Sequence, residues 1–262
     1  MLKFAANLTM LFNEVAFLDR FELASRSGFK YVEYLFPYEW SADELAKKLN
    51  QFDLQQVLFN LPAGDWANGE RGIACLPDRK EEFKEGLALA IEYAEVLQVS
   101  QVNCLSGLRP NEETDEVLWE TLIENISYAA SRLQDHNICL MIEPINSKVD
   151  MPGFFIDTFE KAKLLLNAVN STNIKIQFDI YHMQIMQGDI LHTIASNLKD
   201  IGHIQFADCP GRHEPGSGEL NFDNIFHALD KMKFDGFVSA EYIPQHDSIS
   251  SLHWLPTLVT NI

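Results

Sequence analysis

Short apolar runs alternate with longer amphipathic segments along the whole chain. The runs are rich in β-branched and aromatic side chains and are mostly apolar on both faces, which is typical of strands in a covered parallel sheet. Eight such strands are predicted, at residues 3–7, 30–36, 55–60, 101–105, 138–143, 174–179, 202–206 and 236–241.

The segments between these runs have the apolar spacing of helices. The first, residues 14–27, ends at Gly28, a favourable residue for a helix C-terminus. Ser41 followed by Glu44 forms a capping box that starts the second helix. Further helices are predicted at 78–97, 115–134, 158–169, 190–198, 222–232 and after Ser248. Eight strand–helix units predict a (β/α)8 TIM barrel, an α/β fold, as a single domain over residues 1–262.

Four of the predicted strands in the second half of the chain end near a polar residue. These residues are Glu143, Asp179, Gln205 and Glu241, at spacings of 36, 26 and 36. In a parallel barrel the carboxyl ends of neighbouring strands open on one mouth, so the four side chains are expected to meet there. Three carboxylates and a carboxamide offer only oxygen ligands, which favours Mg²⁺ or Mn²⁺ over zinc. The sequence therefore predicts a divalent-metal site.

A second interpretation stays open for each carboxylate, which can cap the following helix and do nothing more. Several unpaired carboxylates in one mouth repel each other, and a cation removes that penalty. A neutral glutamine ligand is the less usual member of the set.

Two histidines and an arginine lie near these strand ends. His182, three residues after Asp179, either caps or packs at the start of a helix or donates to a substrate oxygen. His203 lies two residues before Gln205 on the same predicted strand, so its side chain should also point inward, one layer deeper. There it would support the ligands or fill the barrel interior. Arg212, in the loop after the seventh strand, is either a solvent-exposed residue or a partner for an oxygen-rich substrate.

The longest irregular stretch is residues 61–77, directly after the third strand. A loop of that length in a compact domain is usually functional. Three glycines offer hinges, and Trp66 and Arg71 offer groups to cover a ligand, so a lid is predicted. The alternative is a loop without a functional role.

Composition narrows the class of protein. A 47% hydrophobic fraction suffices for a large core, and the net charge of -18 argues against a nucleic-acid partner. No apolar stretch approaches the ~20 residues of a membrane span, and the N-terminus lacks the pattern of a signal peptide. The four cysteines are scattered without a Cys-x-x-Cys pair, which favours a reducing, cytoplasmic location. A homo-oligomer is left open.

Motifs along the whole chain carry a family resemblance. They include Phe-Asn-Leu-Pro-Ala-Gly-Asp-Trp at 59–66, Glu-Pro-Ile-Asn at 143–146 and the highly specific His-Ile-Gln-Phe-Ala-Asp-Cys-Pro-Gly-Arg-His-Glu-Pro-Gly at 203–216. On these motifs the chain resembles the hydroxypyruvate isomerase family of the xylose isomerase-like TIM barrels, including its 2-oxo-tetronate isomerase branch.

The resemblance implies that Glu143 and Glu241 are an acid/base pair as well as metal ligands. It implies that Asp179 and Gln205 complete the metal site. The residues expected to contact substrate are His182, Arg212, Asn60, Trp66 and Arg71. Lys148 departs from the family, whose members tend to carry arginine there, and Gln245-His246 stands where a basic residue is common. Both departures bear on how the far end of a substrate is held.

The resulting hypothesis is a metal-assisted isomerase that interconverts hydroxypyruvate and tartronate semialdehyde, or a related 2-oxo-tetronate. An enediolate would form and collapse by proton transfer between the two glutamates. A keto-sugar 3-epimerase with the same metal and glutamate pair is the main alternative. A DNA-repair enzyme similar to endonuclease IV and a non-catalytic sugar-acid sensor also stay open.

Overall fold

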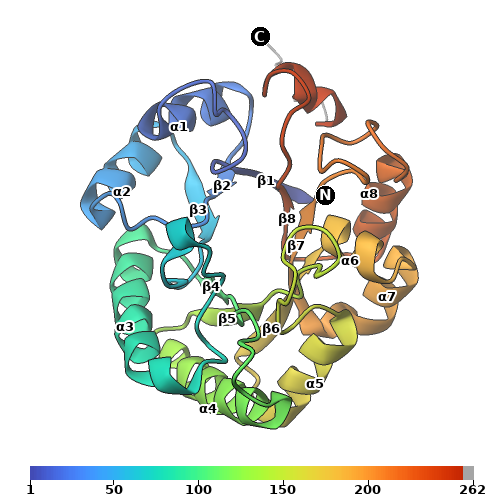
Figure 1. Cartoon of the computed structure of the whole chain (residues 1–262). Coiled ribbons are helices and arrows are strands. Elements are labelled where there is room, and N and C mark those ends of the chain that lie inside the picture. The colour runs from blue at the N-terminus through green and yellow to red at the C-terminus, as the bar shows by residue number, and fades with distance from the viewer. Residues whose placement is uncertain (256–262) are drawn as a thin grey trace.

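Eight parallel strands surround the centre of the molecule, and the helices form a ring outside them (Figure 1). The computed structural model describes residues 1–255. The strands are β1 Lys3–Asn7, β2 Tyr31–Glu33, β3 Gln55–Leu58, β4 Gln101–Cys104, β5 Cys139–Ile142, β6 Ile174–Asp179, β7 Ile201–Phe206 and β8 Phe237–Ala240. Their hydrogen-bonded order is β3-β2-β1-β8-β7-β6-β5-β4.

Hydrogen bonds just beyond β3 join the two ends of this sheet. The Leu61 amide donates to the Asn103 carbonyl oxygen at 2.8 Å, and the Asn103 amide donates to the Phe59 carbonyl oxygen at 2.9 Å. The sheet therefore forms a nearly closed barrel, and the predicted fold class is confirmed. The single-domain prediction extends to residue 262, beyond the described residues.

The helices follow the predicted segments closely. They are α1 Phe17–Arg26, α2 Ala42–Gln51, α3 Lys80–Leu97, α4 Asp115–Gln134, α5 Phe159–Val169, α6 Ile180–Met186, α7 Ile190–Asn197 and α8 Phe222–Lys231. Ser41 caps α2 by accepting a hydrogen bond from the Glu44 amide, as the capping box predicts. The predicted helix after Ser248 is a short 3-10 segment, Ser250–Trp254, and its continuation lies outside the described residues. No helix of residues 1–255 is long and apolar enough to cross a membrane.

The short helix α6 has no counterpart in the predictions. It starts directly after β6, with Asp179 as its N-cap, and has only seven residues. A segment of two turns is too short to display a clear apolar period, so the pattern of the sequence does not reveal it.

Inward-facing side chains are arranged in layers because successive residues of a strand point to opposite faces. A small apolar cluster that includes Ala5 and Met141 packs against Tyr31 and Phe237 at the amino end of the barrel. Two residues further along these strands the inward positions become polar. These positions are Asn7, Glu33, Glu143 and Ser239, and all are buried. On these four strands the interior therefore changes from apolar side chains at the amino end to polar side chains near the carboxyl end.

Candidate active site

Three buried carboxylates and one guanidinium meet at the mouth. Glu143 follows β5, Asp179 ends β6 and Glu241 follows β8, and their exposed fractions are 5%, 0% and 3%. Arg212 Nη2 lies 2.6 Å from Glu241 Oε2 and 3.6 Å from Asp179 Oδ2. If all three carboxyls ionise, one positive charge faces three negative ones.

The pKa directions follow from this imbalance. Burial raises the pKa of Glu143 well above its ordinary value, and the charges of Glu241 and Asp179 raise it further. Burial also raises the pKa of Glu241 to about 8, against the lowering effect of Arg212. The pKa of Asp179 is likewise raised by burial, although Arg212 opposes the shift. The mouth therefore lacks positive charge, which either protons or a cation can supply.

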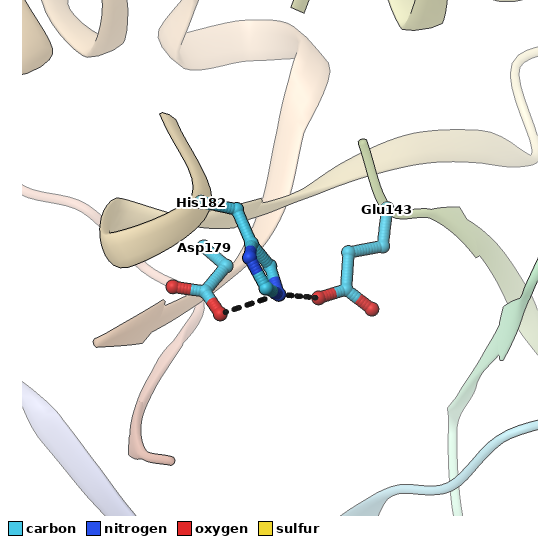
Figure 2. Close-up of side chains that lie close together, drawn as sticks. All are labelled: Glu143, Asp179 and His182. Atoms are coloured by element: carbon cyan, nitrogen blue, oxygen red, sulfur yellow. Dashed lines mark ion pairs between the residues drawn. The ribbon is translucent and has the colours of Figure 1, made fainter. Parts of the chain in front are cut away.

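His182 lies between two of the carboxylates (Figure 2). Its Nε2 is 3.5 Å from Asp179 Oδ2 and 3.8 Å from Glu143 Oε1. Burial lowers the pKa of His182 well below its ordinary value, and Arg212 lowers it further, so the imidazole is neutral.

Asn146 determines which nitrogen of His182 carries the proton. The Asn146 Oδ1 accepts hydrogen bonds from the Val149 amide at 3.0 Å and the Asp150 amide at 2.9 Å. Its NH₂ group therefore faces His182 Nδ1, at 2.7 Å, and Nδ1 acts as the acceptor. The proton of the neutral ring is then on Nε2, which points at the carboxylates. The sequence did not indicate Asn146, because its effect depends on a contact between the loop after β5 and helix α6.

One carboxylate oxygen of Asp179 accepts a hydrogen bond and the other accepts none. Its Oδ1 accepts a hydrogen bond from the Tyr181 amide at 2.8 Å, so the residue does cap a helix. Its Oδ2 is buried and has no hydrogen-bond partner among the described residues. Glu143, Asp179 and His182 offer ligand atoms within 4.8 Å of one another. A buried carboxylate oxygen that accepts no hydrogen bond and lies near another carboxylate fits a hard cation, whereas the proton on Nε2 makes His182 a donor rather than a ligand.

Gln205, the fourth predicted ligand, is buried just below these groups. Its NH₂ group donates to Glu33 Oε1 at 2.7 Å, and its Oε1 accepts from Gln177 Nε2 at 2.5 Å. His203 lies one layer deeper, as its parity predicts, with Nε2 2.8 Å from Glu33 Oε2. The sequence analysis did not single out Glu33 or Gln177, although the inward parity of Gln177 with Asp179 was a usable signal.

The loop after β7 brings Arg212 into the mouth, so its solvent-exposed interpretation is wrong. The Asp208 carboxylate organises this loop by accepting hydrogen bonds from three backbone amides, those of Cys209 at 2.8 Å, Gly216 at 2.8 Å and Leu220 at 3.0 Å. Arg212 itself has a φ of 58°, an uncommon left-handed conformation for a residue other than glycine. Sequence analysis missed Asp208, although an aspartate at the start of a Pro-Gly turn is a recognisable turn signal.

Asn60, predicted to bind substrate, adjoins the carboxylates through Asn103. The Asn103 NH₂ group donates to Asn60 Oδ1 and to Glu143 Oε2, each at 3.1 Å. Asn103 thereby fixes one oxygen of Glu143 and was not identified from the sequence.

The predicted lid residues contact each other. The Arg71 guanidinium stacks 4.2 Å from the Trp66 ring and donates to the carbonyl oxygens of Trp66 and Glu70. Arg71 is thus directed at its own loop rather than at the carboxylates. Gly72 has a φ of 108°, and a Cβ there would lie 2.4 Å from the Leu105 carbonyl oxygen, so close packing on the neighbouring loop requires this glycine. The lid role stays a prediction.

Comparisons with known proteins agree with this architecture. A family model described as xylose isomerase-like TIM barrel matches residues 21–258. A hydroxypyruvate isomerase of Escherichia coli K12 is 47% identical over 255 residues, covering 97% of this chain and 98% of that protein. A 2-oxo-tetronate isomerase of Cupriavidus necator is 42% identical over 253 residues, covering 97% of each.

Among solved structures, a Brucella melitensis protein described as an AP endonuclease of family 2 superposes with a TM-score of 0.94. It is 43% identical in sequence, and the match covers 97% of this chain and 98% of that one. Names given to similar proteins therefore include both isomerases and a nuclease.

The raised carboxyl pKa values predict that the metal-free protein loses stability as the pH rises from 6.5 to 8. The unfolded carboxyls titrate near 4.5, whereas Glu241 titrates at about 8 in the native state. The native state therefore binds more protons in this range, and the free energy of unfolding falls by about 1–2 kcal/mol. Below pH 6.5 the lowered pKa of His182 acts in the opposite sense. Urea unfolding after chelation measures the effect, and a flat or rising profile would contradict it.

Replacing Asp208 should destabilise the loop that carries Arg212. In Asp208→Ala three backbone amides lose their acceptor, so the free energy of unfolding should drop by about 2–4 kcal/mol. Asp247→Ala is the matched control, because that exposed carboxylate also accepts from a nearby backbone amide, that of Ser250. Its cost should stay below about 1 kcal/mol in the same urea titration. Equal losses in the two variants would contradict the prediction.

Proposed function

We propose, given that this chain belongs to the xylose isomerase-like TIM barrel family and is an isomerase, that it interconverts hydroxypyruvate and tartronate semialdehyde or a related 2-oxo-tetronate. The relatives with those names align over nearly the whole chain, which supports this class of substrate. The observation that carries the chemistry is the unbalanced charge of the mouth, where Glu143, Asp179 and Glu241 face Arg212 alone.

In this proposal Glu143, Asp179 and Glu241 hold Mg²⁺ or Mn²⁺ together with Gln205. The unpartnered Asp179 Oδ2 and the raised carboxyl pKa values support a cation at this position. The chemistry that a bound divalent cation supplies is polarisation of the substrate's carbonyl and hydroxyl oxygens and stabilisation of enediolate charge.

The two glutamates then exchange protons with adjacent carbons. One carboxylate takes a proton from C3 of hydroxypyruvate, and the electron pair of that C–H bond forms the C2–C3 double bond of the enediolate. The other glutamate, as the acid, gives a proton to C2 as this double bond collapses. The proton of the C3 hydroxyl passes to the C2 oxygen, so that C3 becomes the aldehyde and C2 carries the hydroxyl of tartronate semialdehyde. The reverse reaction exchanges these roles. Asn103 orients Glu143, and Asn7 orients Glu241 by donating to its Oε1 at 3.0 Å.

Two further side chains are suited to bind the substrate. His182 offers a neutral Nε2–H group, held in that tautomer by Asn146, to a substrate oxygen. Arg212 offers positive charge to the carboxylate of a 2-oxo acid. Its Nε is buried and has no hydrogen-bond partner in residues 1–255, so this donor is free for a ligand.

Isotope exchange in D₂O separates the roles of the glutamates. Glu143→Gln and Glu241→Gln should each lower turnover by about 10²–10⁴-fold, because each removes one proton-transfer group. The variant that lacks the C2 acid should still exchange C3 protons of hydroxypyruvate without forming product. The variant that lacks the C3 base should show no such exchange but should exchange the C2 proton of tartronate semialdehyde. NMR follows both reactions with Mg²⁺ or Mn²⁺ present.

The competing functions are tested with the same preparation. Turnover of ketohexoses with no turnover of 2-oxo acids would establish the epimerase alternative. Cleavage of DNA with an abasic site is assayed because the Brucella relative is described as an AP endonuclease. Turnover of hydroxypyruvate or a 2-oxo-tetronate without solvent deuterium in the product would indicate a hydride shift and overturn the two-glutamate scheme.

A further inference from the structure

A further buried carboxylate, which takes no part in the proposed proton transfers, lies beside the mouth at the end of β2. Glu33, at the end of β2, is 1% exposed. Its Oε1 accepts hydrogen bonds from Asn7 Nδ2 at 2.9 Å and Gln205 Nε2 at 2.7 Å, and its Oε2 lies 2.8 Å from His203 Nε2. Burial alone raises the pKa of Glu33, but His203, Gln205 and Asn7 outweigh it and leave the pKa below its ordinary value. Three donor groups around its two oxygens favour the ionised form of Glu33.

His203 holds this charge from below. It is fully buried, and its Nδ1 lies 2.9 Å from the Gln101 NH₂ group. Because an ionised carboxylate accepts but does not donate, the 2.8 Å contact with Glu33 requires a proton on Nε2. A buried polar pair of this kind carries a desolvation cost that apolar residues of the same volume would avoid. Its presence in the barrel interior calls for a reason other than stability.

The orientation of Gln205 supplies that reason. A side-chain amide has a donor end and an acceptor end, and only the donor end can face Glu33. The carboxylate therefore turns the Gln205 carbonyl oxygen away from itself, and this oxygen accepts a hydrogen bond from Gln177 Nε2. Without Glu33 the two orientations of the amide would differ much less in energy.

Glu33 also acts on Glu241, through Asn7. The Asn7 NH₂ group donates to Glu33 Oε1 and to Glu241 Oε1, at 2.9 and 3.0 Å. Its own oxygen accepts from the Thr9 amide at 3.0 Å, so this side chain cannot turn over without losing three contacts. Glu241 Oε1 is thereby fixed, and Oε2 is left to face Arg212.

We propose that Glu33 is a positioning residue that orients the Gln205 carbonyl oxygen and, through Asn7, the Glu241 carboxylate toward a shared cation site. This inference rests on the metal site of the proposed function. In this proposal Glu33, His203 and Gln101 act only by orienting the metal ligands and do not contact substrate.

The first test measures the affinity for Mn²⁺ alone by titration calorimetry. Glu33→Gln preserves the shape of the side chain but removes the charge that selects the amide orientation, so Kd should rise by about 10–100-fold. Glu14→Gln is the control, because Glu14 also accepts two hydrogen bonds, from the amide and hydroxyl of Ser248, but neither residue is a predicted ligand or a recorded partner of one. Its Kd should equal that of the wild type. An unchanged Kd in Glu33→Gln, with an unchanged circular dichroism spectrum, would overturn the proposal.

A double-mutant cycle tests whether Glu33 acts through Gln205. Gln205→Ala should raise the Kd for Mn²⁺. In that background Glu33→Gln should raise Kd by a factor at least three times smaller than in the wild type, because coupled residues are not additive. Additive effects would indicate a general structural disturbance and would refute the positioning role.

A second readout does not depend on any metal. In ¹⁵N-labelled, metal-free protein the side-chain amide resonances of Gln205, assigned by their loss in Gln205→Ala, should shift in Glu33→Gln and stay unchanged in Glu14→Gln. Unmoved resonances in Glu33→Gln would overturn the positioning role. If these resonances shift but the wild type binds no Mn²⁺, the metal site of the proposed function fails and the orienting role of Glu33 on Gln205 stands.

Discussion

Unbalanced charge inside the barrel mouth is the constraint on which the other features of this protein depend. Glu143, Asp179 and Glu241 are buried at neighbouring strand ends, and Arg212 is the cation recorded in contact with them. Burying ionised carboxylates without partners is costly, so their pKa values rise until protons or a cation restore neutrality. The loops around the mouth are built to meet this constraint. Asp208 fixes the loop that brings Arg212 inward.

Much of this arrangement was predictable because strands have a strict two-residue period. Parity along β6 and β7 places Asp179 and Gln205 on the inward face, and the register pairs these two residues directly. The parallel topology then brings their ends to one mouth, so the identities of the clustered side chains follow from the apolar runs alone. The same parity placed His203 one layer lower, as the structure has it.

Features that depend on contacts between distant segments were not predictable in this way. Asn146, in the loop after β5, sets the tautomer of His182 in α6, and Asp208 closes its loop on amides up to twelve residues away. Arg71 has a sequence context typical of a lid, yet the structure turns it onto Trp66 within its own loop. Local patterns determine which face of a strand a residue occupies, but the choice among several hydrogen-bond partners is made only when the elements pack.

Glu33 and Glu241 show how the same residue type acquires opposite properties at neighbouring positions. Both are buried, but Glu33 faces three donors, His203, Gln205 and Asn7, which lower its pKa. Glu241 is bonded to Asn7 and Arg212, and the charge of Glu33 is among the causes that raise its pKa. The same charge raises the pKa of Glu143. A negative charge beside the mouth thus makes both glutamates stronger bases and attracts a cation, while its own protonation is suppressed. Glu33 therefore contributes to the electrostatic potential in which the mouth carboxylates work, after the larger effect of burial.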